Sequence, residues 1–497
     1  MIRCQNLAEQ RGDGQVDSTK FDVVTIGGGP GATPAAEYLA RRGKRVAVVE
    51  QGPGLGGTCL FEGCIPSKIY LETARRIRDI HEDVRFGLPD AHFGQVALAS
   101  LTERKQKILR QRTDEAKKTF AALGIAVLHG QADFLDPHRV IVQSDEAPDR
   151  VLTADYIIAS PGSRPRPLHV PEADDASLWT NAHALKLDAI PSSLCIVGGG
   201  YIGVELATLY HTLGTQVHIL ESAPRLLISE DPAIAAYLEN AWSRESDPVT
   251  VETGVRITRI DTTGHGRWAV GYNHPQRGFS RLVVDRVLVA IGREPNTQHL
   301  SWDKAGITLG PRGEVPVNRY QQTVTPHIYA PGDVNGQMML AHAATRQSQI
   351  AAQHILKIPE FPEAMTVPHV IFSFPEISAV GADTRDLPDN PDWRVTVWPY
   401  GNSAKPLIVG DGGGFAQIIW SAATHEVKGC QIIGQGAGEL IDEITYVITH
   451  NDTLESLVEA IHPHPTLSEV VGELGASALA QAEAERPGAS RKEIGTD

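Results

Sequence analysis

The sequence has no long apolar run and few cysteines. No stretch approaches the roughly 18 consecutive apolar residues that a membrane-spanning helix requires, so no membrane segment is expected. Only 5 of the 497 residues are cysteine, an odd and sparse set that does not fit a secreted disulfide framework. Residues 1–20 contain acidic side chains and no apolar stretch, so they do not resemble a secretory signal. We expect a cytoplasmic protein that begins with a flexible N-terminal extension over these residues.

Positive charge is also scarce. Lys and Arg number 45 against 60 Asp and Glu, which gives a formal net charge of -15 at pH 7. A net negative charge repels polyanions, so neither nucleic acid nor an anionic membrane is expected as the main partner. The composition, 41% hydrophobic and 21% charged, is that of ordinary globular domains, and the length allows about two to four of them.

The clearest organisational feature is an internal repeat. Residues 21–50 and 194–222 each contain an apolar β-rich run, a glycine cluster, a helical stretch and a second β-rich run. This order predicts two βαβ units, whose paired strands are parallel and whose crossovers are right-handed.

Each repeat has a glycine loop between its first strand and its helix. The small residues at the spacing G-x-G-x-x-G/A are Gly27, Gly29 and Ala32 in the first copy and Gly198, Gly200 and Gly203 in the second. The first permits a tight turn, the second lets the backbone approach a pyrophosphate, and the third packs helix on strand. The pyrophosphate then lies at the positive end of the helix, so we expect two dinucleotide sites.

An acidic residue ends the second strand of each repeat. Glu50 follows Gly27 by 23 positions, and Glu221 follows Gly198 by the same number. Such a carboxylate accepts hydrogen bonds from a ribose and repels a 2′-phosphate, which favours NAD over NADP. Glu221 as an ordinary solvated strand end is the alternative.

The remaining segments suggest how the chain leaves and re-enters the first domain. Residues 154–162 and 287–292 read as short buried strands that end in glycine loops. From about residue 367 alternating strands begin, residues 438–451 look helical, and the polar tail after residue 482 is expected to be mobile.

Two cysteines, Cys59 and Cys64, follow the first repeat within GGTCLFEGCIPSK. In a regular helix their Cα atoms would be roughly 8–9 Å apart, too far for a disulfide. If the two bond, the backbone must depart from the helix, and Gly63 is placed to permit this. Spacing alone leaves open two unrelated buried thiols, whereas a metal site lacks further ligands.

Several motifs resemble the class I pyridine nucleotide–disulfide oxidoreductases, and among them most the dihydrolipoamide dehydrogenases. The cysteine segment resembles the redox-active signature GGTCxNxGCxPSK of that family. TPHIYAPGDV at 325–334 resembles the second flavin-contacting segment, and GAGELI at 436–441 with HPHPTLSE at 462–469 resembles the dimerisation domain. The resemblance spans roughly residues 21–475.

The resemblance implies a role for each matching residue. Cys59 would be the interchange thiol, Cys64 the thiolate against the flavin, and Asp333 the ligand of the ribitol. Lys68 would lie near flavin N5 with Glu205 as its acidic partner, although both could be ordinary surface charges. The residues expected to bind the cofactors are Gly27, Gly29, Gly31, Ala32, Glu50, Gly57, Thr58, Lys68, Gly162, Gly332, Asp333, Ala341, Gly198, Gly200, Tyr201, Ile202, Gly203, Glu221 and Gly292.

His464 is the expected catalytic base. It precedes a proline, which favours an extended loop, and Glu469 follows five residues later. A histidine oriented by a carboxylate can take a proton from a thiol, and only the resulting thiolate attacks a disulfide. We expect a structural role for the neighbouring His462. By resemblance, His464 reaches the disulfide of the other subunit, which implies a homodimer.

The resemblance implies an α/β fold with two Rossmann-like dinucleotide-binding domains, for FAD and NAD, and a C-terminal α+β dimerisation domain. The expected boundaries are 1–20 for the extension, 21–163 and 289–365 for the FAD-binding and central segments, 164–288 for the NAD-binding domain, 366–481 for the interface domain and 482–497 for the tail. The implied reaction is oxidation of a dihydrolipoyl group on a carrier protein by NAD+, with FAD as the second cofactor.

Other functions remain open at this point. A related reductase could act on another disulfide, although no vicinal cysteine pair follows Cys430 as in mercuric reductase, and Glu221 does not suit the NADPH of glutathione reductase. A non-catalytic flavoprotein scaffold is a further alternative. Phe61 and Glu62 depart from the signature, and we hypothesise that Glu62 disfavours thiolates nearby.

Overall fold

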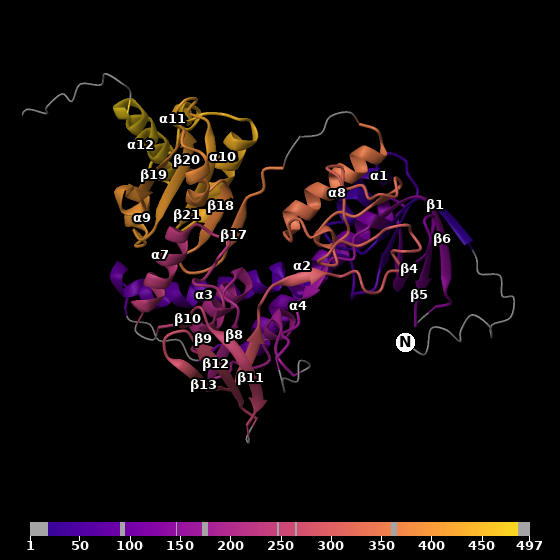
Figure 1. Ribbon diagram of the computed structural model, residues 1–497, viewed down its shortest axis with the longest axis horizontal. Coiled ribbons are helices and arrows are strands. Elements are labelled where there is room, and N and C mark those ends of the chain that lie inside the picture. The colour runs from indigo at the N-terminus through magenta and orange to yellow at the C-terminus, as the bar shows by residue number, and fades with distance from the viewer. Residues whose placement is uncertain are drawn as a thin grey trace, which may run out of the picture. The chain divides into compact units, whose positions relative to one another are not determined.

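The computed structural model describes residues 18–89, 95–145, 147–170, 177–245, 248–263, 266–358 and 365–485. By its internal contacts the chain forms two compact units (Figure 1). The first comprises residues 1–65, 103–164 and 293–363, and the second comprises residues 66–102, 165–292 and 364–497. This division puts residues 66–102 with the second unit and does not separate the expected NAD-binding and interface domains, whose boundaries stay a prediction.

The first unit is built on a mixed sheet in the order β3-β2-β1-β6-β5-β4, with β16 paired to β6. Its strands are β1 (Ser18–Ile26), β2 (Val46–Glu50), β3 (Ala126–His129), β4 (Gln131–Asp136), β5 (Arg139–Gln143), β6 (Arg150–Ala159) and β16 (Ile328–Tyr329). β1 pairs in parallel with β2 and β6, whereas β4, β5 and β6 pair antiparallel. The first βαβ unit is therefore confirmed.

Both faces of this sheet are buried. Alternate residues of β1 belong to different clusters, with Val23 in the core beneath the helices α1 (Thr33–Ala40) and α8 (Ala341–Ile355) and Val24 in the core on the other face. Since side chains alternate along a strand, near-continuous apolar runs are what a doubly covered sheet requires. Figure 1 shows α1 and α8 side by side, and these helices contact each other.

Further helices, strands and turns belong to the first unit or lead from it into the second. They are α2 (Gly57–Phe61), α3 (Cys64–Glu82), α4 (Leu98–Ala122), β7 (Ser163–Pro165), β15 (Arg293–Pro295) and the 3₁₀ turns η1 (Asp83–Phe86) and η2 (Asp333–Asn335). β15 pairs with β7.

The second unit contains the second βαβ repeat. Its parallel sheet has the order β10-β9-β8-β14, formed by β8 (Ser193–Val197), β9 (Gln216–Leu220), β10 (Thr250–Glu252) and β14 (Arg286–Val289). The helices α5 (Asn181–Ala184), α6 (Tyr201–Thr212) and α7 (Pro232–Ser243) accompany it. An antiparallel sheet of β11 (Arg256–Thr262), β12 (Trp268–His274) and β13 (Gly278–Val284) shares a core with β8 and β14. The second βαβ unit is confirmed as well.

The C-terminal part has the expected α+β character. Its antiparallel sheet, β17-β18-β21-β20-β19, is formed by β17 (His369–Ile371), β18 (Ile377–Gly381), β19 (Trp393–Pro399), β20 (Phe415–Ser421) and β21 (Val427–Ile433). Helix α10 (Ala437–Thr449) packs on β18 and β21, and α12 (Glu469–Glu485) packs on β19 and β20. The remaining elements are α9 (Ala404–Ile408), α11 (Leu454–Glu459), η3 (Thr384–Asp389) and η4 (Tyr400–Asn402).

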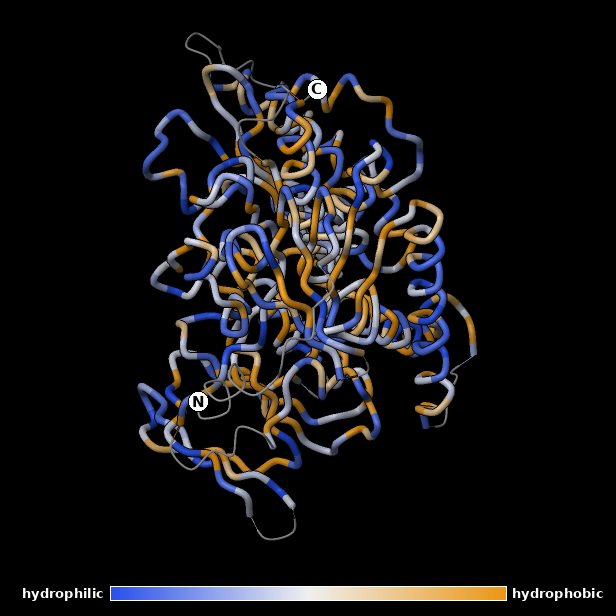
Figure 2. Tube along the Cα trace, turned by 90° about the vertical axis from the view of Figure 1, so that its right-hand side faces the viewer, coloured by the Kyte–Doolittle hydropathy of each residue, from blue (hydrophilic) through white to orange (hydrophobic). Residues whose placement is uncertain are grey.

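The hydropathy of the residues agrees with the buried cores described above. In Figure 2 the hydrophobic stretches lie mostly toward the inside of the fold and the hydrophilic turns mostly toward its outside. Among the described residues, no helix is long and apolar enough to cross a bilayer.

Two expected boundaries are wrong. Strand β1 begins at Ser18, so residues 18–20 pair with β6 and do not belong to a flexible extension; residues 1–17 lie outside the described part. Helix α12 continues to Glu485 because Ala482 packs into the C-terminal core, so the expected tail begins late; residues 486–497 also lie outside the described part. A smaller difference concerns Glu221, which directly follows β9 instead of ending it.

Candidate functional site

The first glycine loop, between β1 and α1, is held by close backbone packing. Gly27 has φ +97°, and a Cβ there would lie 2.2 Å from the carbonyl oxygen of Ser160. A Cβ on Gly31 would lie 2.1 Å from the Ser160 hydroxyl, which in turn donates to the carbonyl of Pro331. Ser160 and Pro331 therefore close the floor of this loop.

The second glycine loop, between β8 and α6, repeats this arrangement. Gly198 has φ +107° and faces the carbonyl of Ala290, and a Cβ on Gly203 would lie 2.1 Å from the carbonyl oxygen of Gly198. Gly200, at the N-terminus of α6, has open space where a side chain would stand. A bare backbone at the positive end of a helix is what a pyrophosphate needs, so this loop fits a dinucleotide.

The two terminal acids make equivalent contacts in the two loops. Glu50 accepts hydrogen bonds from the backbone N–H of Gly28 at 2.6 Å and of Gly52 at 2.5 Å. Glu221 accepts from Gly199 and Ala223, both at 2.5 Å. Each carboxylate is thereby fixed beside its glycine loop and retains lone pairs that can accept from a ribose hydroxyl.

The cysteine segment departs from a regular helix, which is the departure that a disulfide between the two cysteines would require. Cys59 lies in α2, which ends at Phe61, and Cys64 is the first residue of α3. At Gly63, between them, a Cβ would lie only 3.1 Å from the carbonyl oxygen of Thr58. The positive end of the 19-residue helix α3 favours negative charge on the Cys64 sulfur.

Arg293 is a residue of this region that the sequence interpretation missed. Its Nε donates to the Ser163 hydroxyl at 2.7 Å, and that hydroxyl donates to Asp333 at 2.5 Å. Burial lowers the pKa of Arg293, and the charges of Asp333, Glu62 and Cys64 oppose that shift. Burial also raises the pKa of Asp333. Arg293 directly follows Gly292 in the sequence. Its position beside that expected cofactor residue is the feature from which a role in this region could have been predicted.

Lys68 and Glu205 form an ion pair. The ammonium of Lys68 lies 2.7 Å from one carboxylate oxygen and 2.9 Å from the other. The side chains are 33% and 13% exposed, and Glu205 also accepts from the backbone N–H of Phe372. Lys68 further lies 4.4 Å from the centre of the Phe372 ring. These partners argue against the alternative of two ordinary surface charges.

His464 and Glu469 are also joined. The Nδ1 of His464 lies 2.8 Å from Oε1 of Glu469, whose other oxygen accepts from the backbone N–H of Thr466. The hydrogen bond from His464 lowers the pKa of Glu469. The His464 side chain is 72% exposed, so its Nε2 can reach another molecule. His462, in contrast, is mostly buried and faces Glu443, which suits a structural role.

The other expected cofactor residues lie at element ends next to these features. Gly57 and Thr58 begin α2, Ala341 begins α8, and Tyr201 and Ile202 begin α6. The loop residues Gly162, Gly292 and Gly332 follow β6, β14 and β16, and Gly29 and Ala32 precede α1. No group of three metal-binding side chains was found in the described ranges. Cys195 and Cys430 are buried in strands, which raises the pKa of both thiols.

Comparison with known proteins identifies the family of the chain. Residues 21–348 match the family described as pyridine nucleotide-disulphide oxidoreductase, and residues 367–474 match its dimerisation domain. Dihydrolipoyl dehydrogenases from Bacillus subtilis and Chlamydia trachomatis are 35% and 34% identical, over 91% of this chain and 97% and 96% of theirs.

Two solved structures are similar over nearly the whole chain. LpdA from Mycobacterium tuberculosis superposes with a TM-score of 0.84, and the Cu(II) complex of the HOCl-induced flavoprotein disulfide reductase RclA from Escherichia coli with 0.82. Each is 26% identical and covers 92% of this chain and 99% of its own. The expected mixed α/β fold is confirmed. The chain belongs to the pyridine nucleotide-disulphide oxidoreductase family, as a flavoprotein disulfide oxidoreductase related to dihydrolipoyl dehydrogenase.

Proposed function

We propose that this protein oxidises a protein-bound dihydrolipoyl group with NAD+. The observation that carries the proposal is the His464–Glu469 pair, an exposed base oriented by a carboxylate in a chain that also has the Cys59–Cys64 segment. The similarity to dihydrolipoyl dehydrogenases over most of both chains supports the choice of substrate.

The cofactors follow from the family and the two loops. The family binds FAD and a pyridine nucleotide. The Gly27 loop with Glu50 and the Asp333 network would hold FAD, and the Gly198 loop with Glu221 would hold NAD. When bound, FAD would supply the two-electron redox chemistry that connects the cysteine pair with NAD+. The carboxylate of Glu221 supports NAD over NADP, because it would repel a 2′-phosphate.

The proposed thiol chemistry begins at His464. Its Nε2 takes a proton from one substrate thiol, and the imidazolium so formed is stabilised by Glu469. The substrate thiolate attacks Cys59 of a Cys59–Cys64 disulfide and displaces the Cys64 thiolate. The second substrate thiol resolves the mixed disulfide, leaving the substrate oxidised and the cysteine pair reduced. Overall, dithiol and NAD+ give disulfide, NADH and one proton.

The match to the dimerisation domain supports a homodimer in which His464 serves the cysteines of the partner subunit. A lipoyl-carrier protein is the proposed physiological partner. The similarity to RclA, whose TM-score nearly equals that of LpdA, makes reduction of another disulfide the second candidate function.

Steady-state turnover of dihydrolipoamide with NAD+ tests the proposal on the purified holoenzyme. We expect NADH production that is lost in Cys59→Ser and reduced roughly 10²- to 10⁴-fold in His464→Gln, the usual effect of removing a general base. Cys195→Ser, at a buried thiol away from this chemistry, is the matched control and should retain activity. Bound flavin that NADH reduces, without any dihydrolipoamide turnover, would overturn the substrate and favour the second candidate.

A further inference from the structure

The antiparallel sheet β11-β12-β13 exposes one of its faces. The other face is buried, with Ile260, Val270 and Val284 in the core. On the exposed face, Arg259 of β11, Gly271 of β12 and Arg281 of β13 lie directly across from one another. Two arginines therefore flank a residue without a side chain.

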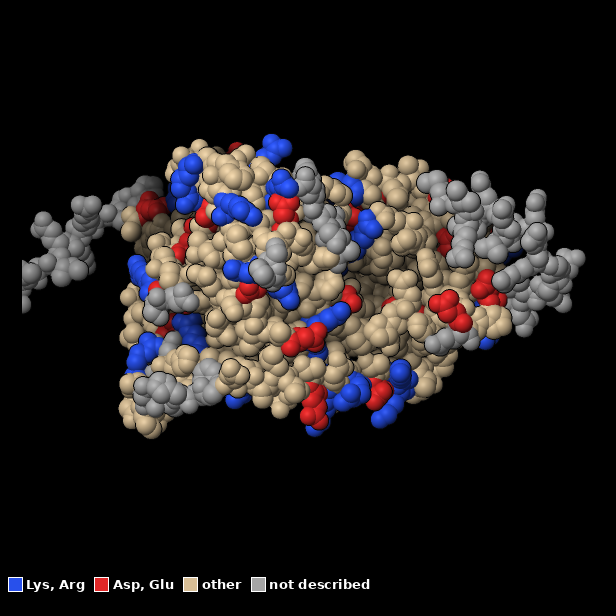
Figure 3. All heavy atoms as spheres, turned by 90° about the horizontal axis from the view of Figure 1, so that it is seen from below, with Lys and Arg blue, Asp and Glu red and all other residues tan. Residues whose placement is uncertain are grey.

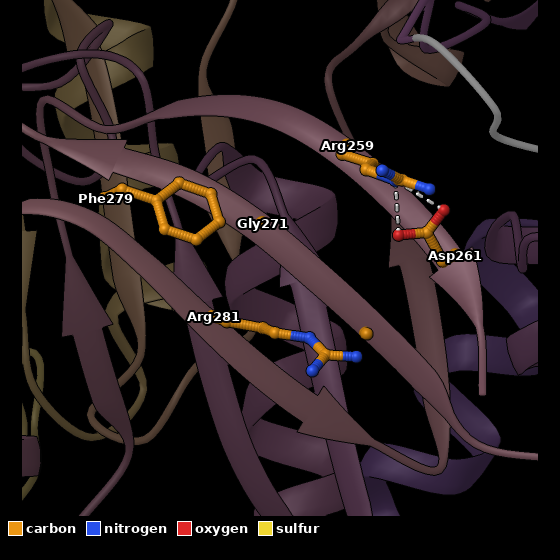
Figure 4. A pocket seen from close by; sticks show the side chains of 6 residues that line it. Arg259, Asp261, Gly271, Phe279 and Arg281 are labelled. Atoms are coloured by element: carbon orange, nitrogen blue, oxygen red, sulfur yellow. Dashed lines mark hydrogen bonds and ion pairs between the residues drawn. The ribbon is translucent and has the colours of Figure 1, made fainter. Parts of the chain in front are cut away.

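A shallow groove of about 380 Å³ follows the middle strand. Its lining residues are Arg259, Asp261, Ala269, Gly271, Phe279 and Arg281. Figure 4 shows Phe279 and Arg281 on one side of Gly271 and the Arg259–Asp261 pair on the other. The groove exists because the two residues of β12 that form its floor, Ala269 and Gly271, are the smallest.

Backbone geometry does not account for the glycine. Gly271 has no positive φ, so its conformation is open to any residue. A glycine inside a strand weakens it, and one reason for such a residue is the close approach of a ligand or another chain. The ring of Phe279 leans toward Gly271, at 3.2 Å from the position of a Cβ, and still remains 67% exposed. Gly271 itself is buried under this ring, so the apolar surface that faces solvent here is the ring of Phe279.

The charge of this sheet is opposite to that of the protein. Residues 256–284 contain five arginines, no lysine and one aspartate, a net charge of +4, in a chain with -15. Arg267 and Arg277 are paired with Asp285 and Glu252, which lie just outside this range, and the net charge with these two acids included is +2. Arg259 is paired with Asp261 at 2.6 Å. Among the described residues, the guanidinium of Arg281 has no ion-pair partner. On the face in Figure 3 both signs are interspersed, so mixed charge is the ordinary condition of the surface there.

We propose that this groove binds an acidic segment of a partner protein. A carboxylate of the segment pairs with Arg281 in a charge-assisted hydrogen bond, and an apolar side chain beside it packs on Phe279 above Gly271. A nucleic acid fits less well, because Asp261 lines the same groove and the chain as a whole repels polyanions. The proposal does not depend on the redox substrate.

Fluorescence anisotropy of a labelled peptide tests the proposal on the full-length holoenzyme. The probe is a fluorescein-labelled peptide in which glutamates flank a leucine, and the matched probe has glutamines instead. We expect saturable binding of the glutamate peptide alone, weakened when NaCl is raised from ~0.05 M to ~0.5 M, because salt screens exposed charges. Arg281→Gln should weaken binding roughly tenfold.

Two further variants separate the groove from general charge. Gly271→Leu fills the floor without changing charge and should weaken binding as much as Arg281→Gln. Arg110→Gln removes the same charge from an exposed position on α4 and should change nothing. Dihydrolipoamide turnover should be the same in all three variants, and the thermal midpoint should be unchanged in Arg281→Gln and Arg110→Gln. Absence of saturable binding, or an equal loss in Arg110→Gln, would overturn the proposal, as would tighter binding of a single-stranded oligonucleotide than of the peptide.

Discussion

Lys68 and Glu205 are 137 positions apart in the sequence, and their charged groups lie 2.7 Å apart in the fold. Replacement of Glu205 by Gln leaves a partly buried ammonium without its counter-charge. Glutamine can still accept a hydrogen bond from Lys68, so we expect the free energy of unfolding to fall by ~1–2 kcal/mol, through loss of the charge-assisted part of this interaction. Thermal denaturation of the holoenzyme measures the change.

Glu72→Gln is the matched control for this prediction. Glu72 pairs with Arg75 and Arg76 on the exposed side of α3, where ion pairs contribute less than ~1 kcal/mol. Equal shifts of the thermal midpoint in the two variants would contradict a special role for the Lys68–Glu205 pair.

Glu62→Val tests the effect of the unusual residue between the cysteines. Glu62 and Cys64 both act electrostatically on Arg293, so the carboxylate competes with the thiolate for the same positive charge. Removing the carboxylate should lower the pKa of the Cys64 thiol. The measurement is charge-transfer absorbance of the reduced enzyme against pH, with the rate of iodoacetamide alkylation as an independent readout. An unchanged titration midpoint would rule the hypothesis out, and Glu72→Val provides the distant control.

Glu221→Gln tests the preference for NAD. Glutamine keeps a carbonyl oxygen that can accept from Gly199 or Ala223 but lacks the negative charge. We expect the ratio of kcat/KM for NADP+ to that for NAD+ to rise roughly tenfold, equivalent to ~1.4 kcal/mol. The equivalent change in the other loop, Glu50→Gln, should leave this ratio unchanged. A wild-type enzyme that already prefers NADP+ would contradict the assignment.

Glu376 links stability to pH. Its carboxylate accepts from the backbone N–H of Gly438 at the start of α10, and burial raises its pKa from 4.5 to about 7. Between these two pH values the folded protein holds a proton that the unfolded chain releases, so the free energy of unfolding falls as pH rises. The loss is at most ~3 kcal/mol.

Glu376→Gln should remove this pH dependence, because a neutral amide can accept the same hydrogen bond without ionising. Denaturation of wild type and variant at pH values below 5 and above 7 measures the difference. Glu459→Gln, at an exposed position at the end of α11, is the control and should keep the wild-type slope. Parallel curves for wild type and Glu376→Gln would refute the prediction.

Several parts of the fold could be predicted because their causes are local. The two βαβ units follow from apolar runs, glycine loops and helical stretches that are contiguous in the chain, and β1–β2 and β8–β9 pair in parallel as predicted. The break between Cys59 and Cys64 is the one that the spacing required if the two cysteines bond, and Gly63 lies between the two helices as that prediction placed it. The family was predicted from the resemblance of short motifs, and the C-terminal α+β part was predicted with it.

What the sequence determined by itself is therefore the order of elements, the two glycine loops and the identity of the reactive side chains. Only the tertiary structure decided which distant groups meet: Arg293 with Ser163, 130 positions earlier, Glu376 with Gly438, and the flat groove over Gly271. It also decided that β1 begins at Ser18 and that α12 continues to Glu485. The physical reason is that these contacts depend on strand register and helix packing, which sum many weak interactions from remote segments, whereas turns and βαβ loops are set by a few neighbouring residues.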